Sequence, residues 1–305
     1  MTDSTTQATT VRDIVRSLRP KQWTKNAVVL AAFFFAFWDR RQDLPLFSSL
    51  LRVIPAAALF CALSSGIYVM NDIKDLEDDR KHPVKRHRPI AAGKISIPAA
   101  WTLVIVLLVC SAIGARALSE RFTVVIGAYV AVQMIYSFGL KRIALLDVLV
   151  IAGGFVLRAI AGAVVLDVYI SAWLLLCTFL LALFLALCKR RHEKILFSDG
   201  AAESRASLEE YDERLLDQLI AVVASATIVC YAIYTLSPGT VAKFGTESLG
   251  FTIPFVVFGI FRYMDLAYRH RKGGRPEQIL LTDPPLLVDL VLYGLCTVVI
   301  FLLRS

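Results

Sequence analysis

The chain has 305 residues, of which 57% are hydrophobic, and it carries a formal net charge of +8. Soluble domains are roughly 45–50% apolar, so the composition excludes an ordinary soluble protein and predicts an integral membrane protein. Most of the 33 lysines and arginines lie on one side of the expected membrane spans. The positive charge therefore reflects membrane topology and contact with anionic lipid, and we do not expect nucleic-acid binding.

Most of the hydrophobic stretches are about 18 to 25 residues long, which is the length of a helix that crosses a hydrocarbon core of about 30 Å. We therefore predict an all-α integral membrane protein with about nine transmembrane helices. Their approximate ranges are 23–38 (with an amphipathic lead-in from residue 11), 46–70, 98–118, 121–139, 144–166, 170–188, 215–236, 251–268 and 284–303.

Lysine and arginine concentrate in the N-terminal segment and in alternate loops, which predicts a cytoplasmic N-terminus. Residues 1–10 are rich in Thr and Ser and contain no signal peptide, so we expect a disordered tail followed by a single membrane domain at 11–305. The six cysteines and four histidines show no disulfide or zinc spacing. Two long charged loops face the cytoplasm, which predicts an active site on the cytoplasmic side of a bacterial-type plasma membrane.

Just before the first span, the chain carries the polar residues Lys21, Gln22, Lys25 and Asn26. Lysines here favour a cytoplasmic flank on topological grounds alone. The alternative is that this segment binds an anionic substrate at the membrane edge. Both interpretations stay open.

An acidic element, Asn71 to Asp79, lies where the second span meets a polar loop. On a helix, Asp72, Asp75 and Asp79 fall within roughly 60° of one another along about 10 Å of axis, so they share one face. Like charges at this spacing repel each other and favour a divalent cation. Magnesium carried by a diphosphate fits, because it binds few carboxylates and keeps phosphate oxygens as its other ligands. Asn71 is expected to assist.

A basic segment follows the acidic one, with Lys85, Arg86 and Arg88 before a turn at Gly93. A metal-bound diphosphate needs this order, because carboxylates hold the cation and basic side chains neutralise the remaining phosphate oxygens. Further along, Lys141 lies in the next cytoplasmic loop.

Two residues of the central spans are harder to interpret. Arg158 lies near the middle of the fifth span, where a charge is costly, so we expect a partner on another helix or a bound substrate. A pair with Asp147 is not expected, because eleven residues separate the two. Tyr136 is a candidate to hydrogen-bond a ribose or phosphate, although tyrosines are common at membrane interfaces.

The second long cytoplasmic loop begins with Lys189, Arg190 and Glu193 and ends near Tyr211. The two basic residues are candidates to bind phosphate, or else they only extend from the helix end towards water. Glu209, Glu213 and Asp217 are spaced four residues apart and would form a second acidic stripe, or a solvated helix face.

Six segments distributed along nearly the whole chain resemble the UbiA superfamily of intramembrane prenyltransferases, and within it the branch that transfers phosphoribosyl groups. The segments are Arg19–Asn26, Asn71–Gly93, Tyr136–Lys141, Arg158–Gly162, Lys189–Glu193 and Ser207–Tyr211. Aromatic prenyltransferases of the superfamily usually carry an Asp-x-x-x-Asp motif after the sixth span. This chain has basic residues there, although Glu213 and Asp217 could stand in for a displaced motif.

The resemblance implies a Mg²⁺-dependent enzyme that joins phosphoribosyl diphosphate to a polyprenyl phosphate and releases diphosphate. The catalytic residues would be Asp72, Asp75 and Asp79, with Asn71 as a fourth metal ligand. The residues expected to bind substrate are Lys21, Gln22, Lys25, Asn26, Lys85, Arg86, Arg88, Tyr136, Lys141, Arg158, Lys189, Arg190, Glu193 and Tyr211. The alternatives are prenyl transfer to an aromatic or other acceptor, or a lipid carrier without enzymatic activity.

Overall fold

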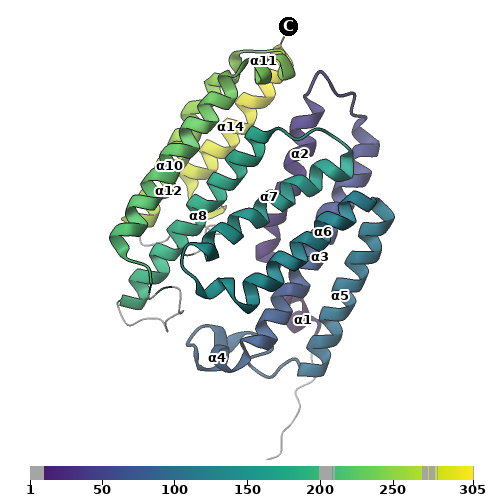
Figure 1. Cartoon of the computed structure of the whole chain (residues 1–305), viewed down its shortest axis with the longest axis vertical. Coiled ribbons are helices and arrows are strands. Elements are labelled where there is room, and N and C mark those ends of the chain that lie inside the picture. Colours follow the sequence, from purple (N-terminus) through teal and green to yellow (C-terminus); the bar gives the residue numbers. More distant parts are fainter. Residues whose placement is uncertain are drawn as a thin grey trace, which may run out of the picture.

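The protein is an all-helical bundle (Figure 1), described by a computed structural model for residues 10–198, 208, 210–269, 274, 279 and 281–304. Within these residues, eight helical segments are long and apolar enough to cross a membrane. Seven of them are α3 (Leu46–Lys74), α5 (Ile97–Leu118), α6 (Glu120–Phe138), α7 (Leu146–Leu166), α8 (Ala172–Ser198), α10 (Glu213–Leu236) and α14 (Pro284–Leu303). The eighth joins the short 3₁₀ helix η4 (Ser248–Thr252) to α12 (Ile253–Tyr268).

The first predicted span is not one continuous α-helix. It consists of a 3₁₀ helix, η1 (Pro20–Ala27), followed by α2 (Val28–Phe37). A 3₁₀ helix rises about 2.0 Å per residue and an α-helix about 1.5 Å, so the two elements together extend about 30 Å. Only α2 and the end of η1 are apolar, and the polar residues of η1 lie at one end of this unit.

A short helix, α1 (Val11–Ser17), precedes η1, and its N-cap is Thr10. The Thr10 hydroxyl oxygen accepts from the backbone N–H of Asp13 at 3.2 Å. Thr10, the last residue of the predicted disordered tail, therefore belongs to the cap of α1. Residues 1–9 lie outside the described residues.

Two groups of helices build the bundle. In the first, α2, α3, α5, α6 and α7 pack around a core that includes Phe60, Phe122 and Tyr129. In the second, α8, α10, α12 and α14 pack around Phe184 and Tyr263. Helix α7 packs against α8 and joins the groups, which appear in Figure 1 as the purple-to-teal and green-to-yellow halves.

The two ends of the bundle differ. Helices α1 and α4 (Leu76–Lys81) lie at the lower end in Figure 1, whereas α11 (Pro238–Phe244) and the C-terminus lie at the upper end. The acidic element at the end of α3 therefore belongs to the lower end. The connection between α2 and α3 belongs to the opposite end, about 40 Å away along the 29 residues of α3.

Helix α8 continues about ten residues beyond the predicted end of the sixth span. Lys189 to Glu193 are therefore helical, and the expectation that they open a loop is wrong. Hydropathy locates the membrane boundary but not the helix end, because polar residues such as lysine and glutamate also sustain a helix in water.

Candidate active site

Three acidic residues lie where α3 meets α4. Asp72 in the last turn of α3 is 3% exposed, and Asp79 in α4 is 2% exposed. Asp75 lies between the helices with φ −92° and ψ 17°, and its side chain is 32% exposed. The backbone leaves the helical conformation at Asp75, so the three carboxylates do not share a single helix face as the spacing had predicted.

Arg88 binds the two buried carboxylates at once. Its Nη1 donates to Asp72 Oδ1 at 3.0 Å and to Asp79 Oδ2 at 2.6 Å. Arg19 also donates to Asp72 Oδ1, from a backbone with φ 54° immediately before Pro20. Sequence reasoning did not select Arg19, whose only signal is its place in a family-like segment. Two arginines thus neutralise two carboxylates at the end of α3.

The chain positions Arg88 through a loop that packs on the bundle. After α4 it forms a short 3₁₀ helix, η2 (Lys85–His87), and then buries Ile90 and Ile95 against α3 and α5. Gly93 closes the turn with φ +73°, a conformation that glycine adopts without strain. This anchored loop fixes the position of the arginine.

Asp75 binds a different cation. Lys141 Nζ lies 2.9 Å and 3.2 Å from its two carboxylate oxygens, and Lys141 belongs to the 3₁₀ helix η3 (Leu140–Arg142) between α6 and α7. The neighbouring Lys74 donates to the carbonyl oxygen of Ser137 at 2.6 Å. The end of α3 is thereby tied to the connection between α6 and α7.

A second polar cluster joins α7 and α8. Asp147 is fully buried and Arg190 is 1% exposed. Arg190 Nε donates to Asp147 Oδ2 at 2.6 Å, its Nη1 pairs with Glu193, and its Nη2 lies 3.4 Å from Tyr136 Oη. Three predicted substrate-binding residues therefore meet around a carboxylate that sequence reasoning did not assign to the site.

Tyr211 completes this cluster from the segment before α10. Its hydroxyl donates to Asp147 Oδ1 at 2.7 Å and accepts from the backbone N–H of Leu145 at 2.7 Å. Burial raises the pKa of Tyr211, and the hydrogen bond to the Asp147 carboxylate raises it further. The hydroxyl therefore keeps its proton at neutral pH and acts as a fixed donor to Asp147.

The backbone beside Tyr211 is strained at Leu145, which has φ 66° and ψ −45°. The N–H of Leu146 donates to the carbonyl oxygen of Ala144 at 2.8 Å, which closes a γ-turn with a positive φ at its central residue. Glu210 accepts from the N–H of Ala144 at 3.2 Å. Such strained turns persist only where their surroundings hold them, and here the segment at 210–211 does so.

Arg158 and Asn26 contact each other within the bundle. Arg158 Nε donates to Asn26 Oδ1 at 2.8 Å, Nη1 to the carbonyl oxygen of Gly154 at 2.9 Å, and Nη2 to Tyr129 Oη at 2.7 Å. The expectation that Arg158 has a partner on another element is confirmed. These acceptors are neutral, so they satisfy the hydrogen bonds of the guanidinium without cancelling its charge.

The remaining predicted residues lie next to these groups in the chain. Lys21, Gln22 and Lys25 belong to η1, which follows Arg19, and Lys85 and Arg86 belong to η2, which precedes Arg88. In α8, Lys189 Nζ lies 3.7 Å from Glu193 Oε1. Of the second acidic stripe, Asp217 pairs with Arg191 at 2.5 Å, whereas Glu209 lies outside the described residues.

The donor set at the end of α3 suits magnesium. Asn71 Oδ1 is buried and has no hydrogen-bond partner among the described residues, which is unusual for a buried polar atom. The carboxylates of Asp72, Asp75 and Asp79 belong to the same end of α3 and the start of α4, and oxygen ligands of this kind suit a hard divalent cation. In the part of the chain that the structure describes, no three acidic, His or Cys side chains converge as a preformed metal site. The carboxylates are paired with Arg19, Arg88 and Lys141 instead.

The model of the UbiA prenyltransferase family matches residues 27–279. Decaprenyl-phosphate phosphoribosyltransferase of Mycolicibacterium smegmatis is 34% identical over 90% of this chain and 87% of its own length. The enzyme of the same name from Mycobacterium tuberculosis strain H37Rv is 35% identical over 90% of both chains. Nodulation protein NoeC of Azorhizobium caulinodans is 30% identical over 74% of this chain and 72% of its own.

Solved structures share the fold. A UbiA homolog from Archaeoglobus fulgidus bound to DMAPP and Mg²⁺ has a TM-score of 0.68, covers 95% of this chain and 99% of its own, and is 17% identical. A digeranylgeranylglyceryl phosphate synthase structure has a TM-score of 0.63 at 15% identity, covering 95% and 98%. At these identities the likeness establishes the arrangement of the helices.

Proposed function

Because this chain belongs to the UbiA prenyltransferase family, we propose that it transfers the 5-phosphoribosyl group of phosphoribosyl diphosphate to a polyprenyl phosphate of decaprenyl type, releasing diphosphate. The observation that carries this proposal is the identity of 34–35% with decaprenyl-phosphate phosphoribosyltransferases over 90–93% of the chain. The fold and the side-chain chemistry at the α3–α4 end support it.

The charges at this end suit a substrate pair that is rich in phosphate. The donor carries a diphosphate and a 5-phosphate, and the lipid acceptor brings another phosphate. Besides Arg19, Arg88 and Lys141, which are bound to carboxylates, the adjoining 3₁₀ helices carry Lys21 and Arg86, both exposed. Fixed cations in this number suit several phosphate groups better than one prenyl diphosphate.

We propose that Asn71, Asp72, Asp75 and Asp79 hold Mg²⁺ on the donor diphosphate. A cation bound there would neutralise charge on the diphosphate as it departs. Arg88 would then donate to phosphate oxygens in place of its carboxylates, which places fixed positive charge where negative charge develops.

In the proposed reaction, an oxygen of the polyprenyl phosphate attacks the anomeric carbon of the ribose. The bond from that carbon to the diphosphate oxygen breaks, the diphosphate takes the electron pair, and positive charge develops on the ribose ring. The attacking phosphate is already an anion at neutral pH, so no general base is required. Catalysis therefore depends on positioning and electrostatics, and Arg190 and Lys189 would hold a phosphate of donor or acceptor.

We place this site at the cytoplasmic side of the membrane, because the lower end of the bundle carries the lysine- and arginine-rich segments. Phosphoribosyl diphosphate is water-soluble and would enter from that side. The polyprenyl phosphate would approach laterally, with its chain in the bilayer and its head group at the end of α3.

Prenyl transfer to an aromatic or other acceptor is the second candidate, since the fold is shared with a homolog solved with a prenyl diphosphate. Where such enzymes usually carry a second acidic motif after the sixth span, this chain has Arg190, buried and paired with Asp147. A guanidinium there opposes binding of a second cation, so phosphoribosyl transfer remains the better candidate.

The test incubates the purified protein with radiolabelled phosphoribosyl diphosphate, decaprenyl phosphate and Mg²⁺, and separates lipid from water-soluble label. We expect labelled lipid and an equal amount of diphosphate. A protein that gives no labelled lipid, yet prenylates an aromatic acid from a prenyl diphosphate, would reverse the order of the two candidates.

Matched variants test the acidic site. Asp75→Asn should abolish turnover while the protein remains folded in the membrane, because a carboxylate proposed as a metal ligand is lost. Asp78→Asn makes the same change three residues away on an exposed side chain, and turnover should stay near normal. Equal effects of the two variants would contradict the assignment.

A further inference from the structure

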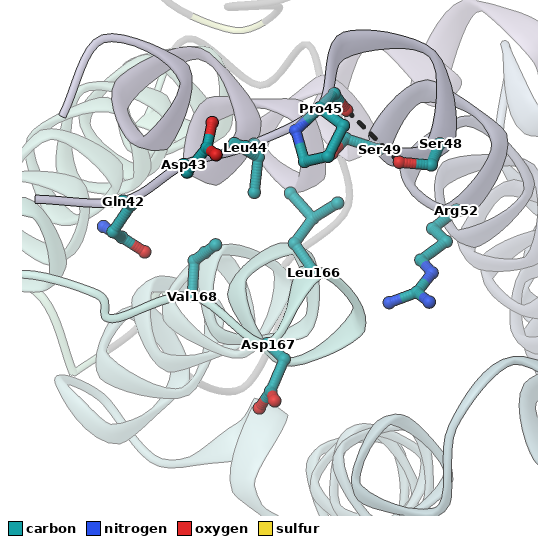
Figure 2. A pocket seen from close by; sticks show the side chains of 10 residues that line it. All are labelled: Gln42, Asp43, Leu44, Pro45, Ser48, Ser49, Arg52, Leu166, Asp167 and Val168. Atoms are coloured by element: carbon teal, nitrogen blue, oxygen red, sulfur yellow. Dashed lines mark hydrogen bonds between the residues drawn. The ribbon is translucent and has the colours of Figure 1, made fainter. Parts of the chain in front are cut away.

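A cavity of about 470 Å³ opens at the end of the bundle opposite the acidic element, between the start of α3 and the end of α7 (Figure 2). Gln42, Asp43, Leu44, Pro45, Ser48, Ser49, Arg52, Leu166, Asp167 and Val168 line it. None of these residues takes part in the proposed transfer reaction. The position and chemistry of the cavity therefore call for a separate explanation.

Arg52 is the only cation that lines this cavity. It lies in the second turn of α3, is exposed, and forms no ion pair or side-chain hydrogen bond with the described part of the chain. Figure 2 shows its side chain extending into the space beside Leu166. An unpaired guanidinium near the end of a membrane-spanning helix reaches the head-group level, so an anionic partner is expected from outside the protein.

Ser49 provides a second, independent observation. It is 4% exposed, lines the cavity, and its hydroxyl has no hydrogen-bond partner among the described residues. Ser49 and Arg52 are three residues apart and so lie on the same side of α3. A hydroxyl that opens into the cavity without a protein partner, beside a free guanidinium, favours a ligand that accepts hydrogen bonds.

The start of α3 adds further donors. Its N-cap is Pro45, which provides no side-chain cap, so the first backbone N–H groups of the helix have no acceptor from that residue. The N-terminus of a 29-residue helix carries partial positive charge and binds phosphate readily. Within the first turn of α3, Ser48 lines the cavity, so its backbone N–H is the donor of the helix start that lies there, beside the Ser49 hydroxyl and the Arg52 guanidinium.

The cavity lies at the level of the membrane interface. The span of α7 ends at Leu166, and Tyr169, which is 72% exposed, follows three residues later. Exposed tyrosines are enriched at the head-group level of membranes. The anion present at this depth is the lipid phosphate of the leaflet that surrounds the start of α3, at the end of the bundle away from the acidic element.

We propose that this cavity is a binding site for the phosphate of a glycerophospholipid in that leaflet, with Arg52, Ser49 and the start of α3 as donors. Asp43 and Asp167 also line the cavity; Asp167 pairs with Arg121, whereas Asp43 has no ion pair among the described residues and repels head groups with additional negative charge. A zwitterionic head group such as phosphatidylethanolamine therefore binds better than an anionic one.

The test uses the full-length protein in detergent, with phosphatidylethanolamine added, and native mass spectrometry to measure retained lipid. The wild type should retain the lipid, and Arg52→Gln should lower its affinity roughly tenfold because a charge-assisted hydrogen bond is lost. Ser49→Ala should lower the affinity less, and Arg52→Lys should keep part of it. A photoactivatable phosphatidylethanolamine should crosslink within residues 42–52.

Arg116→Gln is the matched control. Arg116 is an exposed arginine in the last turn of α5, on the same side of the membrane but at a helix C-terminus. Its loss should leave lipid retention unchanged, and Arg52→Gln should leave transferase activity unchanged. Unaltered retention in Arg52→Gln, or an equal fall in the control, would overturn the proposal. Displacement of the lipid by millimolar inorganic phosphate would show a site for the free ion and overturn the assignment to lipid.

Discussion

Asp147 has two hydrogen-bonded partners and no contact with water. Asp147→Asn would remove the buried negative charge that compensates Arg190. Glu193 would then be the remaining carboxylate partner of Arg190. Breaking a buried ion pair from one side costs roughly 3 kcal/mol, so we expect a large fall in the free energy of unfolding. Chemical denaturation of the detergent-solubilised protein measures it, and the KM for phosphoribosyl diphosphate should rise.

The neighbouring pair of Arg191 and Asp217 offers the control. Asp217 is 42% exposed, and exposed ion pairs contribute about 1 kcal/mol or less. Asp217→Asn should therefore destabilise the protein much less than Asp147→Asn. An equal fall in the free energy of unfolding of the two variants would show that the burial of Asp147 does not determine its contribution to stability.

The strained turn at Leu145 leads to a prediction of opposite sign. Glycine adopts a positive φ without the steric cost that leucine incurs, so Leu145→Gly should raise the free energy of unfolding by about 1 kcal/mol. Tyr211→Phe removes the hydroxyl that holds the turn, and adding Leu145→Gly should recover part of the lost activity. A double-mutant cycle on kcat/KM measures the coupling, and strictly additive effects would show that the two residues act independently.

Helices α2 and α7 approach each other closely at Gly162. A Cβ placed on Gly162 would lie 1.9 Å from the backbone oxygen of Val29, so Gly162→Ala forces the two helices apart. Overpacking of this kind costs about 1–3 kcal/mol, and we expect a lower melting temperature.

Gly153 lies on the same helix and faces open space, with no atom within 4 Å of an added Cβ. Gly153→Ala should be neutral or stabilise the protein by up to about 1 kcal/mol, because alanine is the better helix former. Comparing the melting temperatures of Gly162→Ala and Gly153→Ala separates the effect of the close helix contact from the effect of helix propensity. A drop in stability for both would point to helix α7 as a whole.

The positions of the helices were predictable because hydrophobic length determines where a chain crosses the membrane. The helix of the second span, for example, was expected from residue 46, where α3 begins, and the last one matches α14 throughout. The broken first span was not predictable, because the pattern does not distinguish a 3₁₀ helix from an α-helix. The continuation of α8 beyond the apolar stretch was missed for a related reason, since hydropathy reports on burial in lipid and not on helix ends.

The acidic element and the basic residues around it were selected from sequence, but their pairing was not. Spacing along one helix placed three carboxylates together, whereas in the structure Arg88 bridges Asp72 and Asp79, and Asp75, at the break in the helix, pairs with Lys141. Asp147 was missed because its importance comes from Arg190 and Tyr211, which are distant in sequence. Contacts between helices depend on packing that a single sequence does not display.

At the scale of the whole molecule, the proposed orientation is open to a direct test. Glu77 near the acidic element and Glu247 near α11 are both exposed, and they lie at opposite ends of the bundle. Introduced singly as cysteines, position 247 should react with a membrane-impermeant maleimide in intact cells, and position 77 only after lysis. The reverse pattern would invert the topology.

The arginines around the acidic element have a consequence for how the protein withstands the loss of divalent ions. Asp72 and Asp79 carry their own counter-charge in Arg88, and Asp72 has a second in Arg19. Proteins whose acidic ligands lack such compensation often unfold when a chelator removes the metal. Here EDTA should stop turnover without changing the melting temperature, because arginines compensate the two buried carboxylates when the proposed Mg²⁺ is absent.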